Sequence, residues 1–129
     1  MFKYHWDDEE KTVFRIIIRP PVIMGEVRDN LSPIYDMLDS VTHNVFVLVD
    51  VGNFMGLPPG IAGLAKDIMK NKRAHVPMHI IIGEGNSLKI GYNIVKLAAP
   101  RLAERMRIVS TDAEANTLIA DYRKSHPPR

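Results

Sequence analysis

The stretch from Val45 to Gly60, VFVLVDVGNFMGLPPG, decides the fold of this chain. It opens with Val45 to Val49, a continuous and mostly β-branched apolar run that is typical of a central strand covered on both faces. Asp50 follows, and then come small, apolar and turn-forming residues that lead into a helix. In open α/β folds, ligands gather at the carboxyl ends of the parallel strands, so we expect the functional surface here.

The residues before this stretch predict a hairpin and a helix. Two strand-like runs, Phe2–Trp6 and Thr12–Arg19, are separated by a short acidic connection, which is typical of an antiparallel hairpin. A helix is expected over most of 25–40, kinked or broken near Ser32 because Pro33 lies within it. Its apolar stripe advances in steps of four and three residues: Val27, Leu31, Ile34, Leu38 and Val41.

The residues after the stretch repeat the same alternation. Pro58-Pro59-Gly60 is expected to open the next helix, since proline is tolerated in a first turn. A short strand is predicted over Met78–Ile82, and Ser87 is expected to cap a helix that reaches about Ala99, with Pro100 marking its end or a kink.

The last unit is a strand over Arg107–Val109 and a terminal helix. Thr111 and Glu114 have the spacing of a capping box, in which each side chain satisfies an amide at the start of a helix. The domain is expected to cover residues 1–123, followed by a flexible tail over 124–129.

The order is therefore β-β-α-β-α-β-α-β-α. It predicts a single α/β domain with a mostly parallel sheet of four or five strands, led by an antiparallel hairpin and accompanied by about four helices.

Composition excludes several classes of protein. The 129 residues contain no cysteine, so disulfides and thiolate sites are impossible. A net charge of +2 is too small to indicate nucleic-acid binding, although the pI is about 9.0. No apolar run approaches the ~20 residues that span a bilayer, so we expect no membrane insertion. The polar N-terminus does not resemble a secretory signal, and a cytoplasmic location is expected.

The element order and the residues VFVLVDVGNFMGLPPGIAGL resemble the STAS domains, the family of sulfate transporters and anti-sigma-factor antagonists. The likeness is to the divergent, stand-alone bacterial branch. In that family a hydrophobic strand ends at an acid, here matched by Asp50, and a helix opens with small residues, here Gly60 to Leu64. RIVSTDAEANTLIADY is similar to the last unit of the family. The resemblance implies a STAS-like fold and a role in protein interaction.

One departure from the family changes the expected chemistry. Antagonist-type members carry a phosphorylatable Ser or Thr at the start of the helix after this loop, but this chain has Leu57-Pro58-Pro59-Gly60. The interval from Val45 to Lys70 contains no Ser or Thr at all. A phosphoswitch at this position, which would add about two negative charges, is therefore excluded.

Candidate site residues follow two of the predicted strands. Asp50 either binds a ligand or accepts amides of its own loop, and Gly83 opens a loop that either makes a simple turn or binds an anion. His75 and His79 are four residues apart, but an extended chain would separate them by roughly 13 Å, so no metal site is expected. The full candidate set is Asp50, Asn53, Phe54, Met55, Leu57, Pro58, Gly60, Gly83, Asn86 and Ser87.

Two hypotheses about function remain. The first is a non-enzymatic, STAS-like regulatory or protein-interaction module that uses Phe54, Met55 and Leu57 to dock a protein partner or a second copy as a homodimer. The second is a carrier of a small molecule or acyl chain, with a pocket between the loops after Asp50 and Gly83. No cofactor is expected, and no acid/base pair or nucleophile indicates an enzyme.

Overall fold

The strands form one five-stranded sheet in the order β1-β2-β3-β4-β5. The structure is a computed structural model and describes residues 1–53 and 56–127. β1 pairs antiparallel with β2, and the remaining neighbours pair in parallel. The strands are β1 (Phe2–Trp6), β2 (Val13–Ile18), β3 (Phe46–Asn53), β4 (Met78–Glu84) and β5 (Met106–Val109). The predicted single α/β domain, with a mixed sheet led by a hairpin, is confirmed.

Six helices occur in the described residues, compared with the four expected. They are α1 (Met24–Asp29), α2 (Leu31–Asp39), α3 (Ile61–Lys70), α4 (Asn86–Ala98), α5 (Pro100–Glu104) and α6 (Asp112–Ser125). The difference arises because two expected helices are each divided. The first breaks at Asn30, two residues before Ser32, and the other breaks before Pro100.

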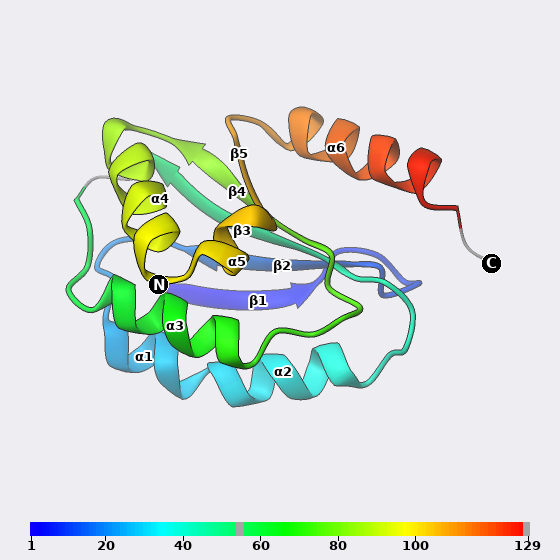
Figure 1. The fold of residues 1–129 in the computed structure, drawn as a ribbon. Coiled ribbons are helices and arrows are strands. Elements are labelled where there is room, and N and C mark those ends of the chain that lie inside the picture. Colours follow the sequence, from blue (N-terminus) through cyan, green and yellow to red (C-terminus); the bar gives the residue numbers. More distant parts are fainter. Residues whose placement is uncertain (54–55, 128–129) are drawn as a thin grey trace.

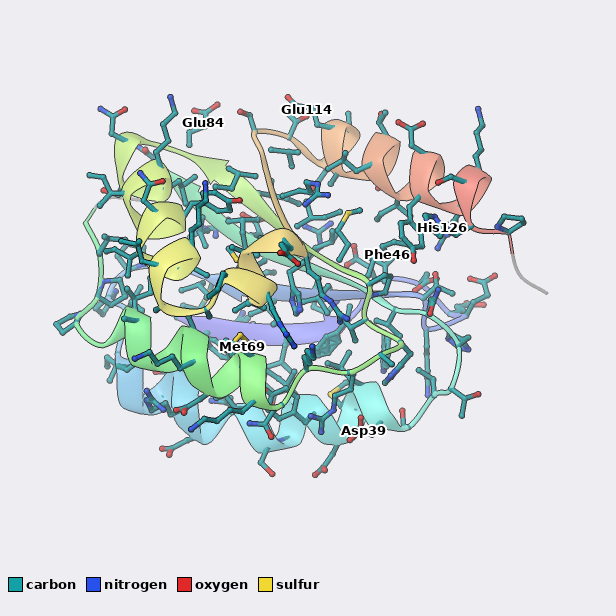
Figure 2. All side chains as sticks on the ribbon, viewed as in Figure 1. Asp39, Phe46, Met69, Glu84, Glu114 and His126 are labelled. Atoms are coloured by element: carbon teal, nitrogen blue, oxygen red, sulfur yellow. The ribbon has the colours of Figure 1, made fainter. Side chains whose placement is uncertain are left out.

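The helices form two unequal layers around the sheet (Figure 1). Strands that follow one another in order through right-handed crossovers place their connecting helices on the same face, which we call the inner face. The helices α1 to α5 cover this face, and α6 covers part of the opposite, outer face. Phe46 lies on the α6 side of the sheet, whereas Met69 of α3 lies on the inner side (Figure 2).

The outer face has a tightly packed core. Leu48 and Ile80, on adjacent central strands, are almost completely buried and pack with Ala115 and Ile119 of α6. Arg15 of β2 also joins the sheet to α6, since its Nη1 lies 3.2 Å from Asp112 Oδ1. One helix is therefore enough to complete this half of the core.

Several expected boundaries differ from the structure. β3 continues to Asn53, so Asp50 lies inside the strand at a register shift and does not end it. Pro58 and Pro59 precede α3, whose N-cap is Gly60 with φ of 86°, a conformation that glycine adopts readily. α6 extends to Ser125, beyond the boundary expected at residue 123.

The capping box is present at the start of α6. The amide of Glu114 donates to Thr111 Oγ1 at 3.2 Å, and the carboxylate of Glu114 accepts from the amide of Ser110 at 3.3 Å. Ser87 does not cap α4, because that helix begins one residue earlier, after Gly85.

Candidate functional site: an apolar cavity under the helices

A cavity of about 260 Å³ lies between the inner face of the sheet and the helices above it. Its lining is almost entirely apolar and is drawn from all five strands and five of the helices. Representative lining residues are Ile16, Val49, Leu64, Ile81, Val95 and Ile108. A space of this size and character can hold a small apolar molecule.

The two faces of the central strands differ in the accessibility of their side chains. Val49 and Ile81 point to the inner face and remain partly accessible, although five helices stand over that face. Leu48 and Ile80 point to the outer face and are 1% and 0% exposed. The accessible surface of the inner residues therefore belongs to the cavity, because the helices stand above these strands without filling the space between.

His79 is the titratable group of β4 that lines the cavity. It shares the inner face with Ile81 through strand alternation, and its accessible surface faces the cavity while the ring is shielded from bulk solvent. Within the described residues its imidazole makes no hydrogen bond. Burial lowers the pKa of His79 to about 4, with a further contribution from the positive charge of Arg105. The ring is therefore neutral at pH 7.

Tyr35 of α2 also lines the cavity, but it does so with its aromatic ring and not with its hydroxyl. Its Oη is buried and has no hydrogen-bond partner among the described residues. Burial raises the pKa of the phenol, partly opposed by the charge of Arg73. The Arg73 guanidinium lies 4.4 Å from the ring centroid and is held by Asp39 at 3.0 and 2.9 Å. Arg73 thus covers this side of Tyr35.

The loop before α3 closes another side of the cavity. Leu57 and Pro58 line it together with Ser87 of α4, and Ser87 Oγ accepts the amide of Gly56 at 2.9 Å. A Cβ built on Gly91 would lie 3.0 Å from Leu57 Cδ2, so the absence of a side chain at Gly91 lets the loop approach α4. Leu57 is thus a wall residue of the cavity, as in the hypothesis that places a pocket at this loop and not in the one that places an exposed docking patch there.

Asp50 points to the outer face and is engaged in ion pairs. Its carboxylate lies 3.0 Å from Arg19 Nη2 and 3.8 Å from Arg15 Nη1, and it also accepts the amide of Gly52 at 3.2 Å. Of the two alternatives for this residue, the geometry favours the structural one, in which the carboxylate holds the strand end and its loop together.

The remaining candidate residues are dispersed. Asn53 and Asn86 are exposed, and Gly60 is the N-cap of α3. Gly83 lies tightly against β3, since a Cβ there would come within 2.6 Å of Val51 Cγ2. Phe54 and Met55 lie outside the described residues. Among the members of the expected set that the structure describes, Leu57, Pro58 and Ser87 come together in the cavity lining and the others do not.

His79 and Tyr35 were not among the predicted site residues. His79 was considered only as a metal ligand with His75, but Nε2 of His75 donates to the carbonyl of Leu38 at 2.8 Å. Among the described residues, no cluster of three or more acidic or histidine side chains could hold a metal ion. The available signal was a single polar residue, His79, in the otherwise apolar strand segment Met78–Ile82.

No helix within 1–53 or 56–127 has the length and apolar character needed to cross a bilayer. Comparisons with protein-family models, with curated proteins and with solved structures found no match to this chain.

Proposed function

We propose that this domain is a non-enzymatic binding protein that holds a small apolar ligand between its sheet and its helices. The observation that carries the proposal is the accessible surface of Val49 and Ile81 on the helix-covered face, around a cavity of about 260 Å³. The cavity is partly open to the surface, and concave, mostly apolar pockets of this kind are where proteins hold small ligands.

The size of the cavity limits the ligand. An apolar cavity of about 150 Å³ binds benzene, so simple scaling gives a ligand of about ten non-hydrogen atoms here. The apolar lining favours a ligand without charge, because an unpaired charge loses its hydration on entry. A two-ring aromatic hydrocarbon or a medium-length alkyl chain meets both conditions.

Naphthalene is a suitable probe for this proposal. It should bind the purified domain and shift the amide resonances of cavity residues such as Val49 and Leu64 in NMR titrations. Val49→Phe should weaken this binding because the larger ring occupies the cavity. Leu97→Phe is the matched control, because Leu97 is 87% exposed on α4. Absence of naphthalene binding to the folded wild-type domain would contradict the proposal.

The second candidate is a STAS-like interaction module, and one surface feature favours it. Ile90 and Leu97 are seven residues apart on α4 and are 54% and 87% exposed, so they share one face of the helix. This face could hold a protein partner or a second copy. Ile90→Glu with Leu97→Glu should then reduce the molar mass measured by light scattering or abolish partner capture, with Lys89→Glu as the control.

A further inference from the structure

The cavity lining includes a histidine, His79, whose imidazole makes no hydrogen bond among the described residues. His79 lies on the inner face of β4 next to Val47 of β3, which is its register partner. Its ring is buried from bulk solvent, has accessible surface inside the cavity and makes no hydrogen bond within the described residues. Buried polar groups are almost always hydrogen-bonded, so an imidazole in this state lacks the partner that a ligand can supply.

Two other polar groups of the lining do not offer the same opportunity. Ser87 Oγ already accepts the amide of Gly56. Tyr35 Oη is unpartnered, but it has almost no accessible surface, so an atom of a ligand in the cavity cannot reach it. Two lining groups therefore remain without a hydrogen bond among the described residues, the His79 imidazole and the Tyr92 hydroxyl. Of these we choose His79, which lies on the central strand β4 and is shielded from bulk solvent.

The charges and hydrogen bonds around His79 indicate which functional group of a ligand would bind to it. The positive charge that acts on His79 belongs to Arg105, whose Nη1 donates to the carbonyls of Arg73 and Val76 at 3.2 and 3.3 Å. These bonds hold the guanidinium to the backbone, and no Asp, Glu, Lys or Arg among the described residues lines the cavity. A carboxylate would therefore lose its hydration with little compensation. A hydroxyl suits a neutral imidazole, which has one donor and one acceptor nitrogen.

We propose that His79 anchors a neutral ligand through a hydrogen bond to a single hydroxyl group, with the apolar remainder of an alcohol or phenol in the cavity. This inference rests on the proposed function, because it specifies the class of ligand for the same cavity. It predicts that the domain prefers a hydroxylated ligand to the matching hydrocarbon, a selectivity that the apolar lining alone does not provide. A purely apolar site binds a hydrocarbon at least as well as its hydroxylated analogue, because the hydroxyl must give up its bonds to water.

Naphthalene, 2-naphthol and 2-naphthoate form a matched set of probes. The measured quantity is the ratio of the naphthalene Kd to the 2-naphthol Kd, obtained by NMR or calorimetric titration of the full chain. His79→Leu should lower this ratio by about tenfold, which is the effect of one hydrogen bond, while naphthalene affinity changes little. His5→Leu is the matched control, because it makes the same substitution at an exposed histidine of β1 outside the cavity lining, and it should leave the ratio unchanged. 2-Naphthoate should bind the wild-type domain more weakly than 2-naphthol.

A second measurement keeps the inference testable if His79→Leu does not fold. In the wild-type domain, 2-naphthol should shift the ¹⁵N resonances of the His79 imidazole more than naphthalene does. Equal shifts with the two probes, or an unchanged Kd ratio in folded His79→Leu, would overturn the role of His79 and leave the proposed function standing. Failure of naphthalene and 2-naphthol alike to bind the wild-type domain would overturn both.

Discussion

Val49 and Ile81 are register partners on the neighbouring strands β3 and β4, and both keep accessible surface beneath a layer of five helices. Their sequence neighbours Leu48 and Ile80, also register partners, are almost fully buried beneath the single helix α6. The better-covered face of the sheet is therefore the less completely packed one. This contrast locates the cavity in the centre of the sheet and leads to the following predictions.

Enlarging Val49 by one methylene should stabilise the domain. Val49→Ile places the added carbon in the cavity, with an expected gain of about 0.8 kcal/mol in the free energy of unfolding. Val45→Ile is the control, because Val45 is 0% exposed and the same carbon would overpack its site, at a cost of about 1 kcal/mol or more. Urea denaturation of the two variants measures the difference. Destabilisation of equal size in both would argue that the space around Val49 is already filled.

Acid should destabilise the domain through His79. Its pKa is about 4 in the folded protein against 6.5 for the free side chain, so the unfolded chain binds the proton first as the pH falls. Above pH 6.5 the neutral His79 ring makes its full contribution to the free energy of unfolding. This contribution is lost progressively as the pH falls from 6.5 to 4. The expected loss is roughly 3 kcal/mol over this range.

The comparison with His79→Leu isolates this effect. All other ionisable groups are the same in the two proteins, so the difference between the two unfolding free energies, measured at several pH values, reports His79. The wild-type protein should lose more stability than the variant on going from pH 7 to pH 5. Parallel pH profiles would show that the imidazole is solvated in the folded state.

A side chain at Gly83 should be strongly unfavourable. An added Cβ would lie 2.6 Å from Val51 Cγ2 and 2.7 Å from the carbonyl oxygen of Gly52, and the second of these atoms is backbone. Gly83→Ala should therefore cost about 1–3 kcal/mol of stability. Gly25→Ala, in α1, meets no atom within 4 Å and should be neutral or stabilising by up to about 1 kcal/mol. In thermal unfolding, Gly83→Ala should therefore have a lower melting temperature than Gly25→Ala.

Asp50 should contribute to stability and not to ligand binding. Asp50→Asn weakens the ion pairs with Arg15 and Arg19 on the outer face, and since these groups are partly exposed the expected loss is at most about 1 kcal/mol. Its naphthalene affinity should equal that of the wild type. A large change in that affinity would mean that Asp50 affects the shape of the cavity through β3.

The strands of this fold could be predicted from sequence because their signals are local. Apolar and β-branched runs identified β3 and β4, and a short acidic connection identified the hairpin. Helix ends were predicted less accurately. The break at Asn30 and the start of α3 after Gly60 depend on how each segment packs, whereas the prolines that suggested other boundaries fit within or before the helices.

The candidate site was predicted only in part, for a physical reason. Leu57, Pro58 and Ser87 follow the strands that the general rule for α/β folds singles out, and they do line the cavity. The cavity itself depends on how far several helices stand from the sheet, and no local pattern encodes that distance. Likewise, the side of the sheet that Asp50 faces depends on strand register, and Asp50 proved to lie on the face opposite the cavity.

The position of α6 has a consequence for how the domain is made. Of the six described helices, the one that covers the outer face is synthesised after those of the inner layer. Until Ala115 and Ile119 have emerged from the ribosome, Phe46, Leu48 and Ile80 have no cover. The outer face of the sheet therefore stays exposed to solvent during translation until α6 has been made, and exposed apolar surface of this kind favours aggregation.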